Sequence, residues 1–155
     1  MNRCQVKNVK NNGVSEFIIS GSIDESLTHY LDLFTGEQVI IINLDEVISI
    51  NSIGIREWIK LMNKLESSKI KLTKCPKTFI DQVNMVKGFL PSNATIESFY
   101  VPYFSDLTNQ EKKILFVNGK QFKEDFINYE KTITEGGIIF QIDVVVSKYF
   151  KFIKV

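Results

Sequence analysis

One serine of this sequence has a setting in which its hydroxyl could be chemically modified. Ser52 lies in the turn "NSIG", between an apolar run and a segment with helical periodicity. The N-terminus of a helix presents unpaired amides and the positive end of the helix dipole, and both favour an anion. A phosphate on Ser52 would add about −1.5 to −2 charges there. The fold could tolerate such a group, while a partner docked flat against the turn would be repelled.

The same turn also has a purely structural interpretation. Asn51 and Ser52 are both good N-cap residues, whose side-chain oxygens can accept hydrogen bonds from the free amides of the following helix. Gly54 would let a neighbouring backbone or a ligand approach the first turn closely. A capped strand-to-helix turn accounts for all three residues, so this interpretation stays open beside the functional one.

Residues for catalysis are sparse. A hydrolase triad would need Ser52, an acid and His29, the single histidine, but the sequence has no GxSxG elbow. His29 falls on the polar side of a predicted short helix, where an exposed surface histidine is expected. Acidic neighbours such as Asp24 and Glu25 mostly point apart and do not indicate an acid/base pair. No glycine-rich phosphate loop is present. The sequence therefore predicts a protein that is not an enzyme.

The cysteines predict neither a disulfide framework nor a cofactor. Cys4 and Cys75 lie far apart in the sequence, which suits reduced thiols in the cytoplasm. The single histidine, His29, adds too few ligands to the two thiols to complete a zinc site. A zinc site whose ligands come from two chains across an interface remains an open alternative. We therefore expect no metal and no cofactor.

Charge and hydropathy exclude several classes of partner. Nineteen basic and eighteen acidic residues are spread along 155 positions, giving a formal net charge of +1. There is no basic block of the kind that binds nucleic acid or an anionic membrane. The N-terminus has no signal-peptide pattern, and no apolar run is long enough for a membrane span. We expect a cytoplasmic protein with neither nucleic acid nor membrane as a partner, and the oligomeric state stays open.

The elements that must position Ser52 follow the order of an α/β sheet. Its predicted helix is the most strongly patterned one, because Ile55, Trp58 and Met62 form an apolar stripe while charged residues occupy the other side. Trp58 is therefore expected in the core. The predicted order is a hairpin of segments 3–9 and 14–20 around Asn12-Gly13, a helix from residue 24 to near Gly36, a strand over 38–44, the helix after residue 54, a strand over 69–75, a helix from residue 79 closing near 88–91, and a strand over 94–104.

The pattern changes after Phe104. Short strand candidates separated by "NG" and "GG" turns replace the helical periodicity. The sequence thus predicts a mixed α/β unit over residues 1–103 and a small β-rich appendage over residues 104–155. A helix is expected to close the appendage, although Val144, Val145 and Val146 favour a strand on propensity alone.

The first part resembles the STAS family, the sulfate-transporter and anti-sigma-factor-antagonist domains. The resemblance rests on the hairpin, "SGSID", a helix, the apolar strand "VIIINL" and then "SINSIGIREWIKLMNKL". In that family the turn commonly reads Asp-Ser-Ser-Gly. Here Asn51 stands at the Asp, Ser52 at the first Ser, Ile53 at the second Ser and Gly54 at the Gly. The resemblance implies a STAS-like mixed sheet with helices.

The resemblance also implies a function. It indicates a bacterial signalling module that is not an enzyme and that binds a protein partner through the serine turn and the following helix. In the family a serine kinase that is also the anti-sigma factor phosphorylates the first serine, which implies Ser52 as the phosphoacceptor. The positions expected to bind a partner are Asp45, Glu46, Ser49, Asn51, Ser52, Gly54, Arg56 and Glu57.

Two alternatives stay open. Asn51 and Ile53 depart from the family's turn, which favours a constitutive scaffolding module of the same fold without phosphorylation. A small-ligand-binding protein, with a pocket between the sheet and the appendage, is the other. The charged members of the partner-binding set could also be an ordinary solvated face.

The appendage is similar to a zinc-ribbon-like piece that follows some bacterial STAS-like proteins. That piece has two Cys-x-x-Cys knuckles, and here Ser105 and Thr108 stand where the first cysteine pair would be. The terminal "EGGIIFQIDVVVSKYFKFI" resembles its end without the cysteines, which favours a helix over residues 144–153. The resemblance implies a degenerate, metal-free version in which apolar contacts replace the metal. The residues expected to make these contacts are Ile114, Phe116, Phe140, Phe150 and Phe152.

Overall fold

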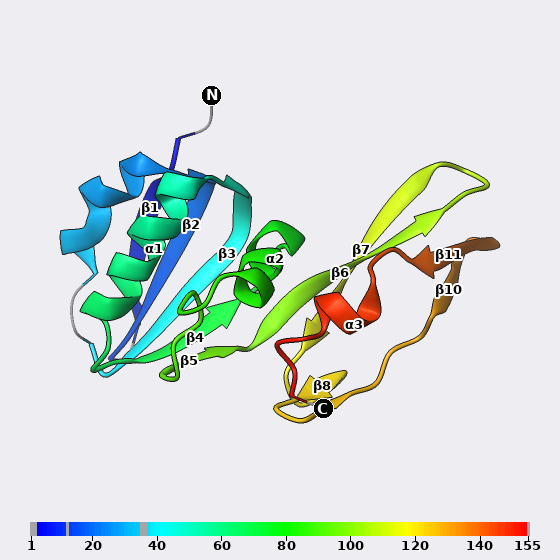
Figure 1. Ribbon diagram of the computed structural model, residues 1–155. Coiled ribbons are helices and arrows are strands. Elements are labelled where there is room, and N and C mark those ends of the chain that lie inside the picture. Colours follow the sequence, from blue (N-terminus) through cyan, green and yellow to red (C-terminus); the bar gives the residue numbers. More distant parts are fainter. Residues whose placement is uncertain (1–2, 12, 35–36, 155) are drawn as a thin grey trace.

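The computed structural model describes residues 3–11, 13–34 and 37–154, which form two β-sheets with helices against them (Figure 1). The first sheet has five strands in the order β1-β2-β3-β4-β5. The antiparallel pair β1–β2 is the hairpin predicted around Asn12-Gly13, and every later pair is parallel; Asn12 itself lies outside the described residues. The strands are β1 (Gln5–Asn11), β2 (Val14–Ile23), β3 (Val39–Ile50), β4 (Lys69–Thr73) and β5 (Ala94–Ile96).

Three helices pack on one face of the first sheet (Figure 1). They are the 3-10 helix η1 (Glu25–Leu33), α1 (Ser52–Lys64) and α2 (Lys77–Met85). Side chains of β2 alternate between a buried set toward the helices, such as Phe17 and Ile19, and a half-buried set on the other face, such as Glu16 and Ile18. Apolar burial on the helical face therefore sets which way β2 and β3 present their polar side chains.

The α1 helix forms as its pattern predicts. Trp58 and Met62 are buried, and the indole nitrogen of Trp58 donates to the carbonyl of Phe89 at 3.0 Å. Trp58 also lies against the rings of Phe79 and Phe89, with centroids 5.1 and 5.7 Å away. This packing holds α1 at a defined angle over the sheet and so positions its first turn.

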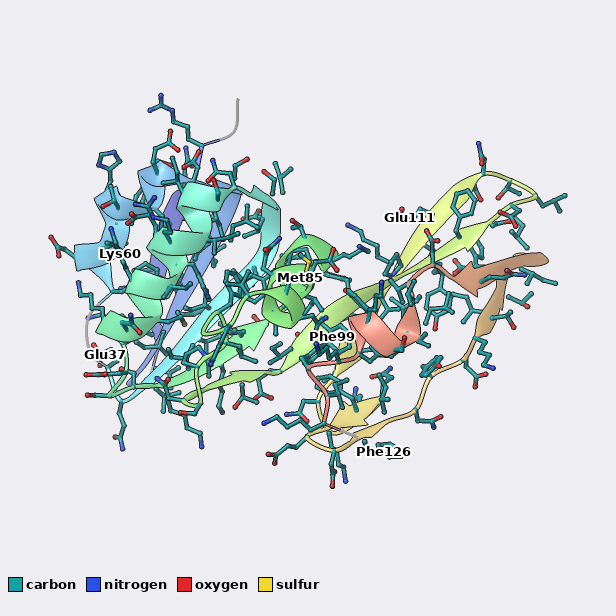
Figure 2. The ribbon with its side chains drawn as sticks, in the orientation of Figure 1. Glu37, Lys60, Met85, Phe99, Glu111 and Phe126 are labelled. Carbon is teal, nitrogen blue, oxygen red and sulfur yellow. The ribbon has the colours of Figure 1, made fainter. Side chains whose placement is uncertain are left out.

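The second sheet is antiparallel and forms the C-terminal part of the molecule (Figure 1). Figure 2 shows Phe99 beside α3, and its ring lies within 5.0–6.1 Å of five aromatic neighbours. The predicted apolar contacts are present: Phe116, Phe140 and Phe150 are buried, and Ile114 and Phe152 pack against them. The elements are β6 (Ser98–Ser105), β7 (Gln110–Val117), β8 (Phe122–Lys123), β9 (Phe126–Ile127), β10 (Thr132–Glu135), β11 (Ile138–Ile142) and α3 (Val146–Tyr149), with the sheet order β10-β11-β6-β7 and a separate ribbon β8–β9.

The two sheets meet where the chain passes from β5 to β6. The amide of Cys75, just after β4, donates to the carbonyl of Ser98. The amide of Tyr100 in turn donates to the carbonyl of Cys75 at 2.9 Å. On the helical side, the Asn84 amide nitrogen of α2 donates to the carbonyl of Tyr149 in α3 at 2.8 Å. One buried apolar cluster runs through both parts.

The predicted fold class is confirmed: a mixed sheet with helices and a β-rich C-terminal part closed by a helix. The proposed division at residues 103 and 104 falls inside β6, whereas the strands change sheet at Glu97, between β5 and β6. The predicted strand over 94–104 is therefore two strands. Because the strand is interrupted at Glu97, Ser98 and Phe99 do not continue β5. They lie beside Cys75, just after the end of β4.

Three helix predictions need correction. The segment after Asp24 is a 3-10 helix, begun by the Asp24 carboxylate accepting from the Ser26 amide; the predicted end at Gly36 lies outside the described residues. The α2 helix ends at Met85, before the predicted end, because the chain turns to bury Phe89 under α1. The closing helix has only four residues, 146–149, and the preceding valines remain outside it, in line with their strand propensity.

The helices of this fold are all short, the longest being the 13 residues of α1. None in the described part of the chain is both long and apolar enough to span a bilayer.

Candidate functional site

Asn51 caps the first turn of α1. Its side-chain oxygen accepts from the Gly54 amide at 2.7 Å, and its carbonyl accepts from the Ile55 amide at 2.9 Å. Its own amide donates to the carbonyl of Ile23 at the end of β2. Of the two predicted cap residues, the structure assigns the cap to Asn51. Ser52 is the first residue of the helix and does not carry this structural role.

Gly54 sits where no side chain fits. A Cβ at this position would collide with the carbonyl of Ile23 and would lie 3.0 Å from the amide nitrogen of Asp24. The predicted close approach of a neighbouring backbone is therefore confirmed, and the neighbour is the end of β2. The contact locks the turn onto the sheet, because β2 and the first turn of α1 touch backbone to backbone.

Ser52 is exposed on this fixed turn. Its hydroxyl forms no hydrogen bond with any other described residue. Ile53 beside it is 43% exposed, an apolar side chain presented to solvent. The turn thus offers a free hydroxyl and an adjacent apolar surface on a rigid base.

The C-terminal half of β3 carries three more of the predicted residues. The register of β3 against β2 shifts at two places. At each of them two consecutive residues are exposed, first Asp45 and Glu46 and then Ile48 and Ser49. The Ser49 hydroxyl lies 2.7 Å from the hydroxyl of Ser22 on the neighbouring strand. These irregularities bring polar groups together at the end of the sheet that leads into Ser52.

Asp45 is bound by a residue that the sequence did not single out. The hydroxyl of Tyr100 in β6 donates to the Asp45 carboxylate at 2.7 Å. Burial raises the pKa of Tyr100 to about 12, and the hydrogen bond and negative charge of Asp45 act in the same direction. Lys113 of β7 lies 5.5 Å from the centre of the Tyr100 ring. The second sheet therefore reaches the predicted partner-binding surface.

The three cations of α1 differ in their partners. Lys60, which projects from the helix in Figure 2, pairs with Glu57 at 3.1 Å, and Lys64 pairs with Asp32 of η1 at 3.4 Å. Arg56 is exposed and forms no ion pair with any residue in the described part of the chain. The positive charge of Arg56 is therefore the one on this helix face that no acid neutralises.

Glu57 is not part of a solvated face. It is 7% exposed, and one of its carboxylate oxygens has no hydrogen-bond partner among the described residues. Gly54 is buried as well. Of the eight residues expected to bind a partner, these two lie beneath the surface, whereas Asp45, Glu46, Ser49, Asn51, Ser52 and Arg56 are exposed.

A hollow of about 590 Å³ lies on the uncovered face of the sheet next to Glu46. It is lined by Arg3, which precedes the edge strand β1, by Lys7 of β1 and by Ser20 of β2. The sequence did not indicate this hollow, because it depends on the pairing of β1 with β2 and on the irregular β3.

The remaining reactive side chains lie elsewhere. His29 is exposed on η1, as expected. Cys4 and Cys75 are both free and buried, and burial raises the pKa of the Cys4 thiol to about 12 and that of Cys75 still further. Within residues 3–11, 13–34 and 37–154, no three His, Cys, Asp or Glu side chains are placed to hold a metal ion.

Comparison with known proteins gives few matches. No family model matches the chain, and no curated protein does. Among solved structures, the chain is similar to the crystal structure of an anti-sigma factor antagonist from Mycobacterium paratuberculosis, with 18% sequence identity and a TM-score of 0.43. The match covers 49% of this chain and 71% of that one.

Proposed function

We propose that this protein is a regulatory module of STAS type that binds a protein partner and is switched by phosphorylation of Ser52. The observation that carries the proposal is that Ser52 is exposed on a fixed turn in which Asn51, and not Ser52, caps the helix. Ser52 is not needed to cap the helix, and the family resemblance places a phosphoacceptor at this position. Both points support a regulatory role.

The proposed partner docks across the start of α1 and the end of β3. Glu46, Ser49, Ser52 and Arg56 are exposed there and would form the contact surface. Gly54 would contribute by holding the turn against Ile23. A partner that fits this surface closely leaves no space for a phosphate and faces about two added negative charges when Ser52 is modified.

The proposed partner is a serine kinase that also acts as an anti-sigma factor. This identity comes from the STAS resemblance. Release on phosphorylation would free the kinase to act elsewhere, so the modification state of Ser52 would report the recent activity of that kinase. The division into a STAS-like unit and a C-terminal appendage belongs to the same proposal.

A constitutive binding module is the second candidate. Ile53 occupies the place of the second serine of the family's turn and is 43% exposed. Burial of this side chain in a contact would remove apolar area from water whatever the state of Ser52, which favours a lasting contact. In that case the partner would bind whatever the state of Ser52.

Affinity co-purification from the native cells tests both candidates. The baits are the wild-type chain, Ser52→Asp and the matched control Ser52→Ala, with quantification by mass spectrometry. The peptide carrying Ser52 is examined for phosphate in the same samples. We expect the wild-type and Ser52→Ala baits to capture a kinase-like partner and the Ser52→Asp bait to lose it. We also expect phosphate on Ser52 in part of the wild-type protein.

The two candidates give different results in this experiment. Equal capture by all three baits, with Ser52 unmodified, would refute the switch and support the constitutive module. Loss of the partner with Ser52→Ala as well as Ser52→Asp would indicate that the hydroxyl itself is a contact, and the phosphate found on Ser52 in the same samples would then decide whether modification of that hydroxyl is used.

A further inference from the structure

We infer that Arg56 is the side chain that receives the phosphate on Ser52, an inference that rests on the proposed modification of that serine. The two residues are four positions apart in α1, and both are exposed. Residues at this spacing are neighbours on one face of a helix, with Cβ atoms about 5–6 Å apart. The long arginine side chain spans that separation easily.

The charges around Arg56 leave it available for this contact. Lys60 and Lys64, the other cations of α1, are already paired with Glu57 and Asp32. The carboxylate of Asp24, at the end of β2 beside the first turn of α1, accepts from the amide and hydroxyl of Ser26. Arg56 itself forms no ion pair with an acid of the described residues, so its guanidinium group is not already bound to a carboxylate.

The chemistry of the pair favours a defined contact. A guanidinium group presents parallel N–H donors that match two oxygens of a phosphate, and such charge-assisted bonds are stronger than neutral ones. Ser52 precedes Arg56 in the helix, so the negative group lies on the N-terminal side, the favourable orientation relative to the helix dipole.

The pair changes what phosphorylation does to the surface. A phosphate alone would add negative charge beside an unchanged Arg56. A phosphate bound to Arg56 also withdraws the unpaired positive charge of α1 from any partner. One modification would then alter both the charge at position 52 and the availability of the cation one turn further along.

Phosphorus NMR on the full chain tests this pair directly. Phosphoserine is placed at position 52 during translation, so no kinase is needed, and the second ionisation of the phosphate is titrated. The variants are wild type, Arg56→Gln and the control Lys64→Gln, which removes a cation from the same helix further from Ser52. Glu25, His29 and Asp32 of η1 and Glu57 of α1 are unchanged in all three.

A nearby guanidinium group favours the dianionic phosphate and lowers its second pKa from the usual value of about 6. We expect Arg56→Gln to raise this pKa by about 0.3–1 unit relative to wild type, and Lys64→Gln to leave it within about 0.1 unit. The difference should shrink as salt is raised from about 0.02 to 0.5 M. Equal melting temperatures of the variants would show that the fold is intact.

Identical titrations of the wild-type and Arg56→Gln proteins would overturn the inference. A shift of the same size in Lys64→Gln would do so too, because it would reflect general charge and not a specific pair. Since the phosphate is installed without a partner, this result is independent of the co-purification. The proposed switch can fail while the pair is present, and the pair can be absent while the switch operates.

Discussion

The hydroxyl of Tyr100 in β6 donates a hydrogen bond to the carboxylate of Asp45 in β3 at 2.7 Å. This contact joins the second sheet to the strand that leads into Ser52. The C-terminal part is therefore connected with β3 by a side-chain pair, in addition to the backbone bonds between Cys75 and β6 and the packing of α3 on α2. Because the Tyr100 phenol is protonated in this pair, we expect the stability of the protein to depend on alkaline pH.

Stability should fall between about pH 10 and pH 12. Burial, reinforced by Asp45, raises the pKa of Tyr100 from 10.0 to about 12. A raised pKa means that the folded state favours the protonated phenol, so the stabilisation is complete below pH 10 and is lost as pH rises toward 12. We expect the urea midpoint to fall across this window and to fall less in Tyr100→Phe.

Tyr149, whose pKa burial raises in the same direction, is present in both proteins and serves as the internal reference. At neutral pH, Tyr100→Phe should cost about 0.5–1 kcal/mol, as expected for one partly exposed hydrogen bond. Parallel pH profiles for the two proteins would contradict the assignment to Tyr100.

Replacing Gly54 with alanine should destabilise the fold. The added methyl group collides with the carbonyl of Ile23, and backbone cannot move aside as a flexible side chain can. We expect a loss of about 1–3 kcal/mol in the free energy of unfolding, typical of overpacking. Urea titration followed by the fluorescence of Trp58, the single tryptophan, measures it. Asn63→Ala on the exposed side of α1 is the control and should change stability by less than about 0.5 kcal/mol.

Asn51 and Ser52 should respond differently to alanine. Asn51→Ala removes the oxygen that accepts from the Gly54 amide and should cost about 1 kcal/mol, the usual value of an N-cap. Asn51→Asp should retain most of the stability because it keeps an acceptor. Ser52→Ala should be nearly neutral, since Ser52 is exposed and is not the cap. A larger loss for Ser52→Ala than for Asn51→Ala, measured by thermal melting, would reverse the assignment of the cap.

Phe99→Ala should destabilise both parts of the molecule. Phe99 is fully buried, and its removal opens a cavity among Phe116, Phe122 and Phe152, for an expected loss of about 3–5 kcal/mol. Phe126, a surface phenylalanine that is 47% exposed, provides the matched control, and its replacement should cost far less. Figure 2 labels both residues.

Denaturant unfolding of Phe99→Ala, followed by two signals, measures this loss and also tests whether the two proposed units unfold together. Trp58 reports on the first sheet, and far-ultraviolet circular dichroism reports on both. Because one apolar cluster runs through both parts, we expect the two transitions to shift together in Phe99→Ala. A Trp58 transition that stays at its wild-type position would mean that the C-terminal part unfolds alone.

Much of the first part could be predicted from short-range patterns. The stripe through Trp58 and Met62 indicated α1, and the β-branched run indicated the buried strand that became β3. The cap chemistry of "NSIG" named Asn51 as one of two cap candidates, although the helix begins at Ser52, two residues before the Gly54 after which its pattern predicted it. These features depend on residues within a few positions of one another, and for them local preference and tertiary packing agree.

The C-terminal part was less predictable. Its strands are two to eight residues long, and short apolar runs do not specify which partner strand they join. The short α3 shows the same difficulty, since the valines before it favour extended backbone while Tyr149 and Phe150 are drawn into the aromatic cluster.

The sequence by itself determined that a polar turn begins an amphipathic helix after a buried strand, and that a serine lies in that turn. Only the tertiary structure decided that Asn51 is the cap, that Gly54 touches Ile23 and that Ser52 is left free. It also decided that Glu57 is buried while Arg56 is exposed and unpaired. The physical reason is distance along the chain: Tyr100 and Asp45 are 55 residues apart, and only folding of the sheets brings such residues into contact.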